Sequence, residues 1–187
     1  MASFAARLPR LGRRAGLERT GFVLYGAAVA AAREPYLYAT HGVPDTLDGR
    51  FDLIVLYAIL LIHRLRFLPE PGPKLAQAVF DAMFSDMDVA LREMGVGDLS
   101  VGKRVRAMWE ALHGRALAYE QALANPDQHA LPQALARNVW RGATPPEGAA
   151  EALARLARAQ HQHLATQAEA NLFAGKVNFL PQAEAAQ

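Results

Sequence analysis

The longest uninterrupted apolar run of this chain extends from Leu53 to Ile62. A helix that crosses a bilayer needs about 20 predominantly apolar residues, so the run has roughly half the necessary length. Asp52 and His63 bound it with ionisable side chains. The run therefore predicts a helix buried in the core of a folded domain and not a transmembrane span.

The rest of the chain is typical of a helical globular protein. Its 187 residues suit one domain with a sizeable core. Alanine dominates the apolar residues and β-branched residues are few, which favours helix throughout. We expect an all-α protein, a single compact domain of about six to seven helices with a mobile basic N-terminus.

Glycine and proline clusters divide the helical pattern into segments. The predicted helices cover residues 22–35, 46–66, 74–94, 99–124, 130–141 and 147–170. Asp45 is predicted to cap the helix that starts at residue 46, with Asp48 completing a capping box. In the helix over 99–124, an apolar face that includes Trp109 and Leu112 is expected to pack on the core.

Three segments follow from this reading. Residues 1–20 form a flexible basic segment, in which five arginines and Glu18 give a local net charge of 5 − 1 = +4. Residues 21–142 form the helical domain. Residues 143–187 form an Ala-rich C-terminal helix and tail with little to anchor them; this helix can pack on the core, mediate dimerisation or stay detached. Residues past Pro181 are expected to fray.

The residues that carry enzyme chemistry are missing or badly placed. Without cysteine, the chain has no disulfides, no thiolate nucleophile and no Cys-based metal site. The segment Gly97–Lys103 matches a phosphate-binding loop, but Arg104 occupies the position that needs Ser or Thr, and a helix precedes it instead of a strand. No serine lies in a nucleophile elbow. We predict no catalytic residue, no cofactor and a non-enzymatic protein.

Metal binding is also disfavoured. His161 and His163 are two residues apart and lie on nearly opposite sides of a helix, whereas ligand pairs on a helix need a spacing of three or four. Asp81, Asp86, Asp88 and Glu93 make one helix acidic, but no Glu-x-x-His pattern accompanies them. A solvated face or a partner-facing acidic patch explains them, with an ion pair between Asp88 and Arg92. His63 is expected to be a helix-end or core residue, and His113 to point toward Trp109.

Between about Tyr25 and Arg141, an ordered set of short motifs resembles one known family. The set contains Tyr36–Tyr38, Gly42-Val-Pro-Asp-Thr46, Gly49-Arg-Phe51, His63-Arg-Leu65, Phe80-Asp81, Phe84, Asp86-Met-Asp88, Leu91-Arg-Glu93, Gly95-Val-Gly-Asp-Leu99, Lys103, Gly114-Arg115, Ala118-Tyr119 and Arg137-Asn138. Their order resembles the ubiquinol–cytochrome c chaperones, the assembly factors for cytochrome b of respiratory complex III. The first twenty residues and those after Gly142 lie outside the resemblance.

The resemblance implies a chaperone that binds nascent cytochrome b and helps to build complex III. Mitochondrial members act with a small partner protein near the ribosomal exit, and this chain looks like a bacterial relative. Because the N-terminus has no secretory pattern, we expect a cytoplasmic protein, with peripheral contact at the inner face of the cytoplasmic membrane as a candidate. The small net charge of +2 predicts no DNA partner. The candidate client or partner surface comprises Arg50, His63, Arg64, Met83, Asp86, Met87, Asp88, Arg92 and Tyr119.

Two residue groups leave alternatives open. Met83 and Met87 are adaptable side chains that suit a client groove or simply fill the core. Four arginines of the N-terminal segment are candidates for contact with a membrane or the ribosome: Arg7, Arg10, Arg13 and Arg14. The alternative functions are a small helical haem- or metal-handling protein and a membrane-surface adaptor.

Overall fold

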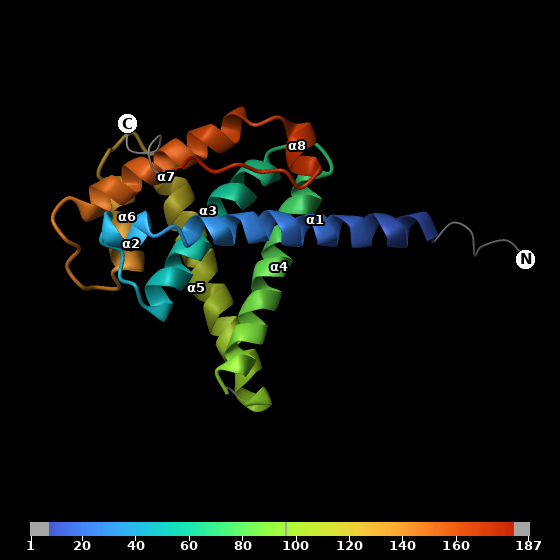
Figure 1. Ribbon diagram of the computed structural model, residues 1–187, viewed down its shortest axis with the longest axis horizontal. Coiled ribbons are helices and arrows are strands. Elements are labelled where there is room, and N and C mark those ends of the chain that lie inside the picture. The colour runs from blue at the N-terminus through green and yellow to red at the C-terminus, as the bar shows by residue number, and fades with distance from the viewer. Residues whose placement is uncertain (1–7, 96, 182–187) are drawn as a thin grey trace, which may run out of the picture.

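The computed structural model describes residues 8–95 and 97–181, with the side chains of residues 8–13, 98, 99 and 101 outside the description. Over these residues the chain is all-helical and forms one compact domain, as predicted. The described residues form eight helices: α1 (Leu8–Ala32), α2 (Tyr36–Ala39), α3 (Leu47–Arg66), α4 (Gly72–Glu93), α5 (Asp98–Ala124), α6 (Ala130–Val139), α7 (Ala149–Thr166) and α8 (Glu169–Phe173) (Figure 1). The single-turn helices α2 and α8 are the ones that the sequence did not predict.

Helix α3 is the centre of the fold and contacts α1, α4, α5, α6 and α7. Most of its apolar run is inaccessible to solvent, which confirms the buried helix predicted there. None of the helices in the described part of the chain is both long and apolar enough to cross a membrane.

The start of α3 differs from the predicted cap. Thr46 is the N-cap, and its hydroxyl accepts a hydrogen bond from the backbone N–H of Gly49 at 3.1 Å. Asp45 instead pairs with Arg50 at 2.6 Å. The capping-box prediction was therefore wrong by one residue, because Thr46 also has a side-chain oxygen suited to this position.

Helix α1 crosses α4 at close range. A Cβ atom at Gly21 would lie 2.6 Å from the carbonyl carbon of Ala78, so only glycine fits at this crossing. The helix begins at Leu8, well before the predicted start at residue 22, and continues through Gly12 and Gly16. The mobility predicted for residues 1–20 stays a prediction.

The Ala-rich helix α7 packs against α3 and α6. Leu153, Leu156 and Leu164 are buried there, together with several of its alanines. The expectation that little anchors this helix was wrong, since small alanine side chains let α7 approach its neighbours closely while the leucines fill the space between them.

After α8 the chain returns as an extended tail alongside α7 (Figure 1). The ring of Phe179 in this tail meets the buried Tyr57 edge-on, with ring centroids 5.2 Å apart. The fraying predicted past Pro181 concerns residues outside those described.

A buried carboxylate ties α3 to α5 and to the turn after α6. Asp52 is fully buried and accepts hydrogen bonds from Arg141 Nε at 2.9 Å and Nη2 at 3.2 Å. Arg115 Nη1 of α5 lies 2.9 Å from the same carboxylate. Burial raises the pKa of Asp52 above its ordinary value, while the two guanidinium groups oppose the shift. The two arginines thus compensate for the unfavourable burial of the Asp52 carboxylate.

Removing this carboxylate is expected to destabilise the fold strongly. Asp52→Ala leaves two guanidinium groups without their buried partner and should lower the free energy of unfolding by about 3 kcal/mol. Asp48 also pairs with Arg141, at 2.8 Å, but its side chain is 67% exposed. Asp48→Ala is therefore the matched control, with an expected loss below about 1 kcal/mol. Urea unfolding measures both, and equal losses would contradict the structural role given to Asp52.

Candidate binding surface

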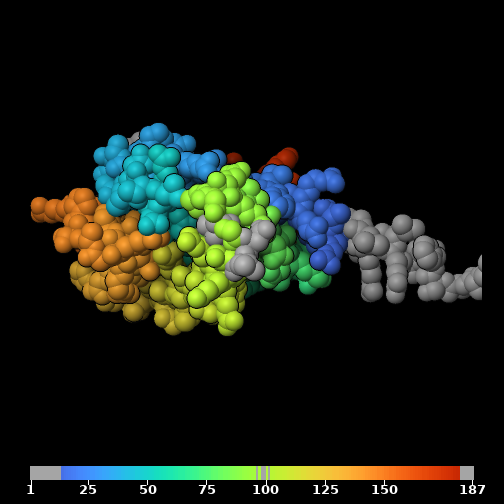
Figure 2. Space-filling view, turned by 90° about the horizontal axis from the view of Figure 1, so that it is seen from below, coloured from blue at the N-terminus to red at the C-terminus, as the bar shows by residue number. Residues whose placement is uncertain are grey.

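Helices α4 and α5 form an antiparallel hairpin that projects from the body of the molecule (Figure 1) and faces the viewer in the view from below (Figure 2). Gly95, with a φ of +79°, ends α4, and Gly97 is the N-cap of α5. The segment that resembles a phosphate-binding loop is therefore a helix–helix turn and the first turn of α5. On these two helices, Met87, Leu91 and Leu112 are buried.

One side of the hairpin exposes apolar residues at helical spacing. Trp109, His113 and Leu117 are four residues apart on α5 and so lie on one side of that helix. We call these three residues the α5 stripe, which is about 12 Å long at 1.5 Å per residue. Trp109 is 46% exposed and Leu117 is 50% exposed. The rings of Trp109 and His113 stack at 5.5 Å, as expected from the sequence.

Exposure of Trp109 corrects the prediction that it belongs to a core-facing surface. The apolar face of α5 is wider than the part that packs on neighbouring helices, because the hairpin projects from the body. Met94 at the end of the hairpin is exposed for the same reason. Amphipathic spacing identifies an apolar face but does not say whether another element covers it.

Charged residues beside the α5 stripe pair with one another. Arg106 lies 3.2 Å from Glu110, and Arg66 of α3 lies 3.0 Å from Glu120. The Arg66 guanidinium also stands over the ring of Phe67, which is 68% exposed. The surface is thus apolar with locally neutralised charges.

Three of the residues predicted for the client surface are buried. Met83, Met87 and Tyr119 are 0%, 5% and 1% exposed. Burial also raises the pKa of the Tyr119 hydroxyl. These side chains pack inside the fold and are not accessible to a partner. The apolar stripe of α4 faces the core, so the methionines fill the core, which was the alternative to a client groove.

The other predicted residues are at or near the surface. Asp88 and Arg92 form the predicted ion pair at 2.8 Å, and Asp86 accepts a 2.7 Å hydrogen bond from the hydroxyl of Tyr25. Arg64 donates to the carbonyl oxygen of Gln167 at 3.3 Å. Arg50 is 13 residues before His63 on α3, about 20 Å along the helix, so the predicted set does not form one compact site.

The predicted membrane or ribosome residues lie near the start of α1. Arg14 is exposed and pairs with Glu18 at 3.0 Å. Arg10 and Arg13 belong to α1, but their side chains lie outside the described part, as does the whole of Arg7.

A histidine pair joins the ends of α3 and α7, which the sequence did not predict. His161 Nε2 and His63 Nδ1 are 3.4 Å apart, although 98 residues separate them in the chain. Burial lowers the pKa of both rings below the ordinary value of 6.5, and for His63 the neighbouring His161 and Arg66 add to the effect while Glu120 opposes it. Within the described residues, no three His, Asp or Glu side chains cluster closely enough to hold a metal ion.

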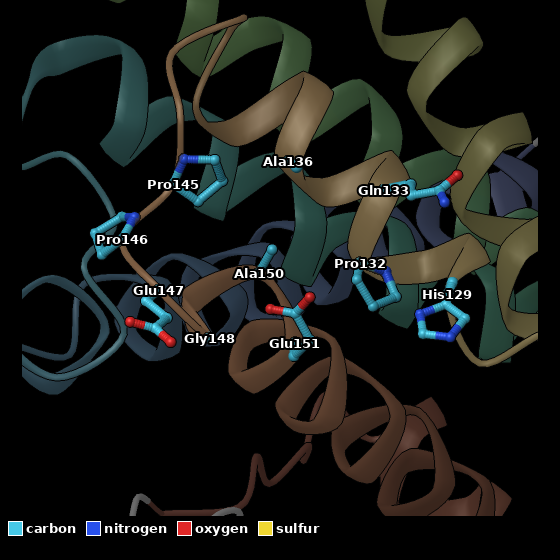
Figure 3. Close-up of a pocket in the computed structure, with 10 residues that line it drawn as sticks. All are labelled: His129, Pro132, Gln133, Ala136, Pro145, Pro146, Glu147, Gly148, Ala150 and Glu151. Carbon is cyan, nitrogen blue, oxygen red and sulfur yellow. The ribbon is translucent and has the colours of Figure 1, made fainter.

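Two cavities lie away from the α5 stripe. A cavity of about 350 Å³ opens between α6 and α7, where Figure 3 shows Glu147 and Glu151 on one side and His129 on the other. Glu151 is in the first turn of α7, where the negative charge of a carboxylate interacts favourably with the helix dipole. A second cavity of about 570 Å³ lies between α1 and α4, and its wall includes Arg14, Glu18 and Asp81. Neither cavity contains a residue of the predicted client surface.

Comparison with known proteins assigns the chain to a family. A sequence profile described as ubiquinol-cytochrome C chaperone matches residues 39–179. The chain belongs to this family. The match starts later than the resemblance found in the sequence and extends through α7, α8 and most of the tail, so the C-terminal part is not an addition outside the family.

A solved relative supports the same assignment. The crystal structure of the Cbp3 homolog from Brucella abortus is 32% identical in sequence, with a TM-score of 0.81. The similarity covers 93% of this chain and 97% of that one. No curated protein sequence matches this chain.

The histidine pair predicts a pH-dependent stability. Because the folded state lowers the pKa of His63 and His161 below 6.5, it favours their neutral forms. Their contribution to stability is complete above pH 6.5 and decreases as the pH falls through and below that value. We expect the free energy of unfolding to fall between pH 7.5 and pH 5.5, and His63→Gln to make this fall smaller.

The matched control is His163→Gln, two residues from His161 on the same helix. It should leave the pH dependence unchanged when unfolding is followed by circular dichroism in urea. If His63→Gln and wild type lose the same stability on acidification, another group is responsible.

Proposed function

We propose that this chain is a non-enzymatic assembly chaperone of respiratory complex III that receives newly made cytochrome b. The observation that carries the proposal is the family match over residues 39–179. The 32% identity to a Cbp3 homolog over nearly the whole chain supports it. The family description supports a client from ubiquinol–cytochrome c reductase, and cytochrome b is the subunit that the family resemblance implies.

The α5 stripe and Phe67 have the properties that such a client requires. They offer exposed apolar area of limited size, which suits a partner that must later leave. Because Arg106 and Arg66 already have carboxylate partners, covering the stripe with an apolar client segment would not bury an unpaired charge. We propose the stripe as the centre of the client surface.

The accessible residues of the predicted surface form charged positions around this centre in the proposal. Asp86, Asp88 and Arg92 lie on α4 of the same hairpin, and Arg64 lies near the end of α3. Charged positions at the rim of an interface favour specificity and the rate of encounter more than affinity. Met83, Met87 and Tyr119 act indirectly, by holding the helices that carry the rim.

A peripheral contact with the inner face of the cytoplasmic membrane fits the basic end of α1. This end projects from the body and carries Arg10, Arg13 and Arg14 (Figure 1). Each cation contributes about 1 kcal/mol near an anionic membrane surface. In the proposal, the same end is also the candidate contact for the ribosome.

The proposed client surface predicts a loss of function without unfolding. The double variant Trp109→Glu/Leu117→Glu places two carboxylates in the stripe, and each should weaken client binding by about 2 kcal/mol, roughly 30-fold. The control Ala107→Glu/Ala111→Glu adds the same charge at two exposed positions of α5 that lie off the stripe. In host membranes, the stripe variant should lose most of the complex III b-type signal in a reduced-minus-oxidised haem spectrum, and the control should keep it.

Two different results would count against this proposal. If deleting the gene leaves the b-type signal intact, the complex III function is wrong. If deletion removes the signal and the stripe variant restores it fully, the function stands and the client surface lies elsewhere. Crosslinking to cytochrome b in the same strains identifies the client directly.

A further inference from the structure

The histidine pair between α3 and α7 brings two imidazole nitrogens from distant parts of the chain close together. His63 lies in the last turn of α3, and His161 lies in the second half of α7. His63 Nδ1 and His161 Nε2 are 3.4 Å apart, and the centroids of the two rings are 5.1 Å apart. Both side chains keep part of their surface exposed, so solvent and small ions have access to the pair.

These two distances fit a pair of metal ligands. Zn²⁺ binds imidazole nitrogen at about 2.0–2.1 Å in a tetrahedral arrangement, so two such nitrogens lie about 3.3–3.4 Å apart. Imidazole rings whose lone pairs meet at the same ion have centroids about 5.2 Å apart. The histidine pair, with 3.4 Å between nitrogens and 5.1 Å between centroids, has nearly this geometry.

A direct hydrogen bond between the rings explains the same distances less well. In a straight N–H···N bond each ring centroid lies behind its nitrogen on the line of the bond, which at this nitrogen separation gives about 5.7 Å between centroids. The observed 5.1 Å is shorter, so the rings are tilted away from that line. A bent hydrogen bond at 3.4 Å is weak. A shared ion would use both lone pairs more fully than this contact does.

Both rings are held in place by the surrounding structure. The ring of Phe67 meets that of His63 edge-on, with centroids 5.0 Å apart. His161 follows the buried Gln160 on α7, a helix that packs against α3. Ligands carried by packed helices keep their positions, so little order has to be imposed on the two rings when an ion binds.

The charged side chains next to His63 have partners of their own. Arg66 lies one helical turn after His63, and its guanidinium pairs with the carboxylate of Glu120 at 3.0 Å. Arg64 donates to the carbonyl oxygen of Gln167 at 3.3 Å. The carboxylate of Glu120 offsets the positive charge of Arg66, which reduces the repulsion that a cation bound at His63 would meet.

We propose that His63 and His161 form an open binding site for one Zn²⁺ ion that links the end of α3 to α7. The two imidazole nitrogens supply two of the tetrahedral positions, and water supplies the others. Among the described residues, no third His, Asp or Glu lies close enough to complete the site. With two protein ligands the site binds zinc reversibly, unlike the closed four-ligand sites on which folding depends.

The test is a zinc titration of the full chain, without an affinity tag, by calorimetry at pH 7.5, where imidazole is mostly neutral. Wild type should bind one ion per chain in the micromolar range. His63→Gln and His161→Gln should each weaken binding at least about tenfold, because one imidazole alone cannot chelate the ion. The matched control His163→Gln removes a histidine on nearly the opposite side of α7 and should bind zinc as wild type does.

Urea unfolding gives an independent readout. An ion that binds only the folded state stabilises it, so zinc should raise the unfolding midpoint of wild type and His163→Gln but not of His63→Gln. Circular dichroism checks that each variant is folded. No zinc binding by wild type, unchanged affinity in His63→Gln or His161→Gln, or an equal loss in His163→Gln would overturn the proposal. Because cytochrome b is absent from these assays, none of the results depends on the proposed function.

Discussion

The buried carboxylate of Asp52 organises the structure around it. It lies near the start of the central helix α3 and is held by Arg115 from α5 and Arg141 from the turn after α6. A buried charge is tolerated only when its partners are held in place, so the interaction orients three segments relative to one another. The position of α5 in turn determines where the hairpin projects and which side of it stays exposed.

The α5 stripe and the tail-covered end of α7 differ in physical character. The α5 stripe offers apolar side chains with neutralised charges around them, so its affinity depends on burial of apolar area. Near the end of α7, Gln160 and Gln167 hold the peptide groups of the chain's own tail, and Tyr57 contacts the ring of Phe179 in that tail. The stripe is open, whereas this part of α7 is covered by the chain's own tail.

Interactions between residues close in sequence were predictable because helix geometry alone fixes them. The Asp88–Arg92 ion pair and the Trp109–His113 contact join residues four apart. The glycines and prolines between helices predicted most helix ends to within a few residues, but glycines inside α1 did not end it. The N-cap of α3 was misassigned because Asp45 and Thr46 are both suitable caps. In the folded chain Asp45 pairs with Arg50, and Thr46 caps the helix.

The sequence by itself determined that this protein is helical, that residues 53–62 are buried, and which family it belongs to, because periodicity, composition and motif order are properties of the chain. Tertiary structure decided which apolar faces are covered. It buries Met83 and exposes Trp109, although both belong to apolar helical faces. It also joins Asp52 to Arg141 and His63 to His161 across 89 and 98 residues. Such contacts depend on how the helices pack. The spacing of residues within one helix does not specify which other helix it packs against.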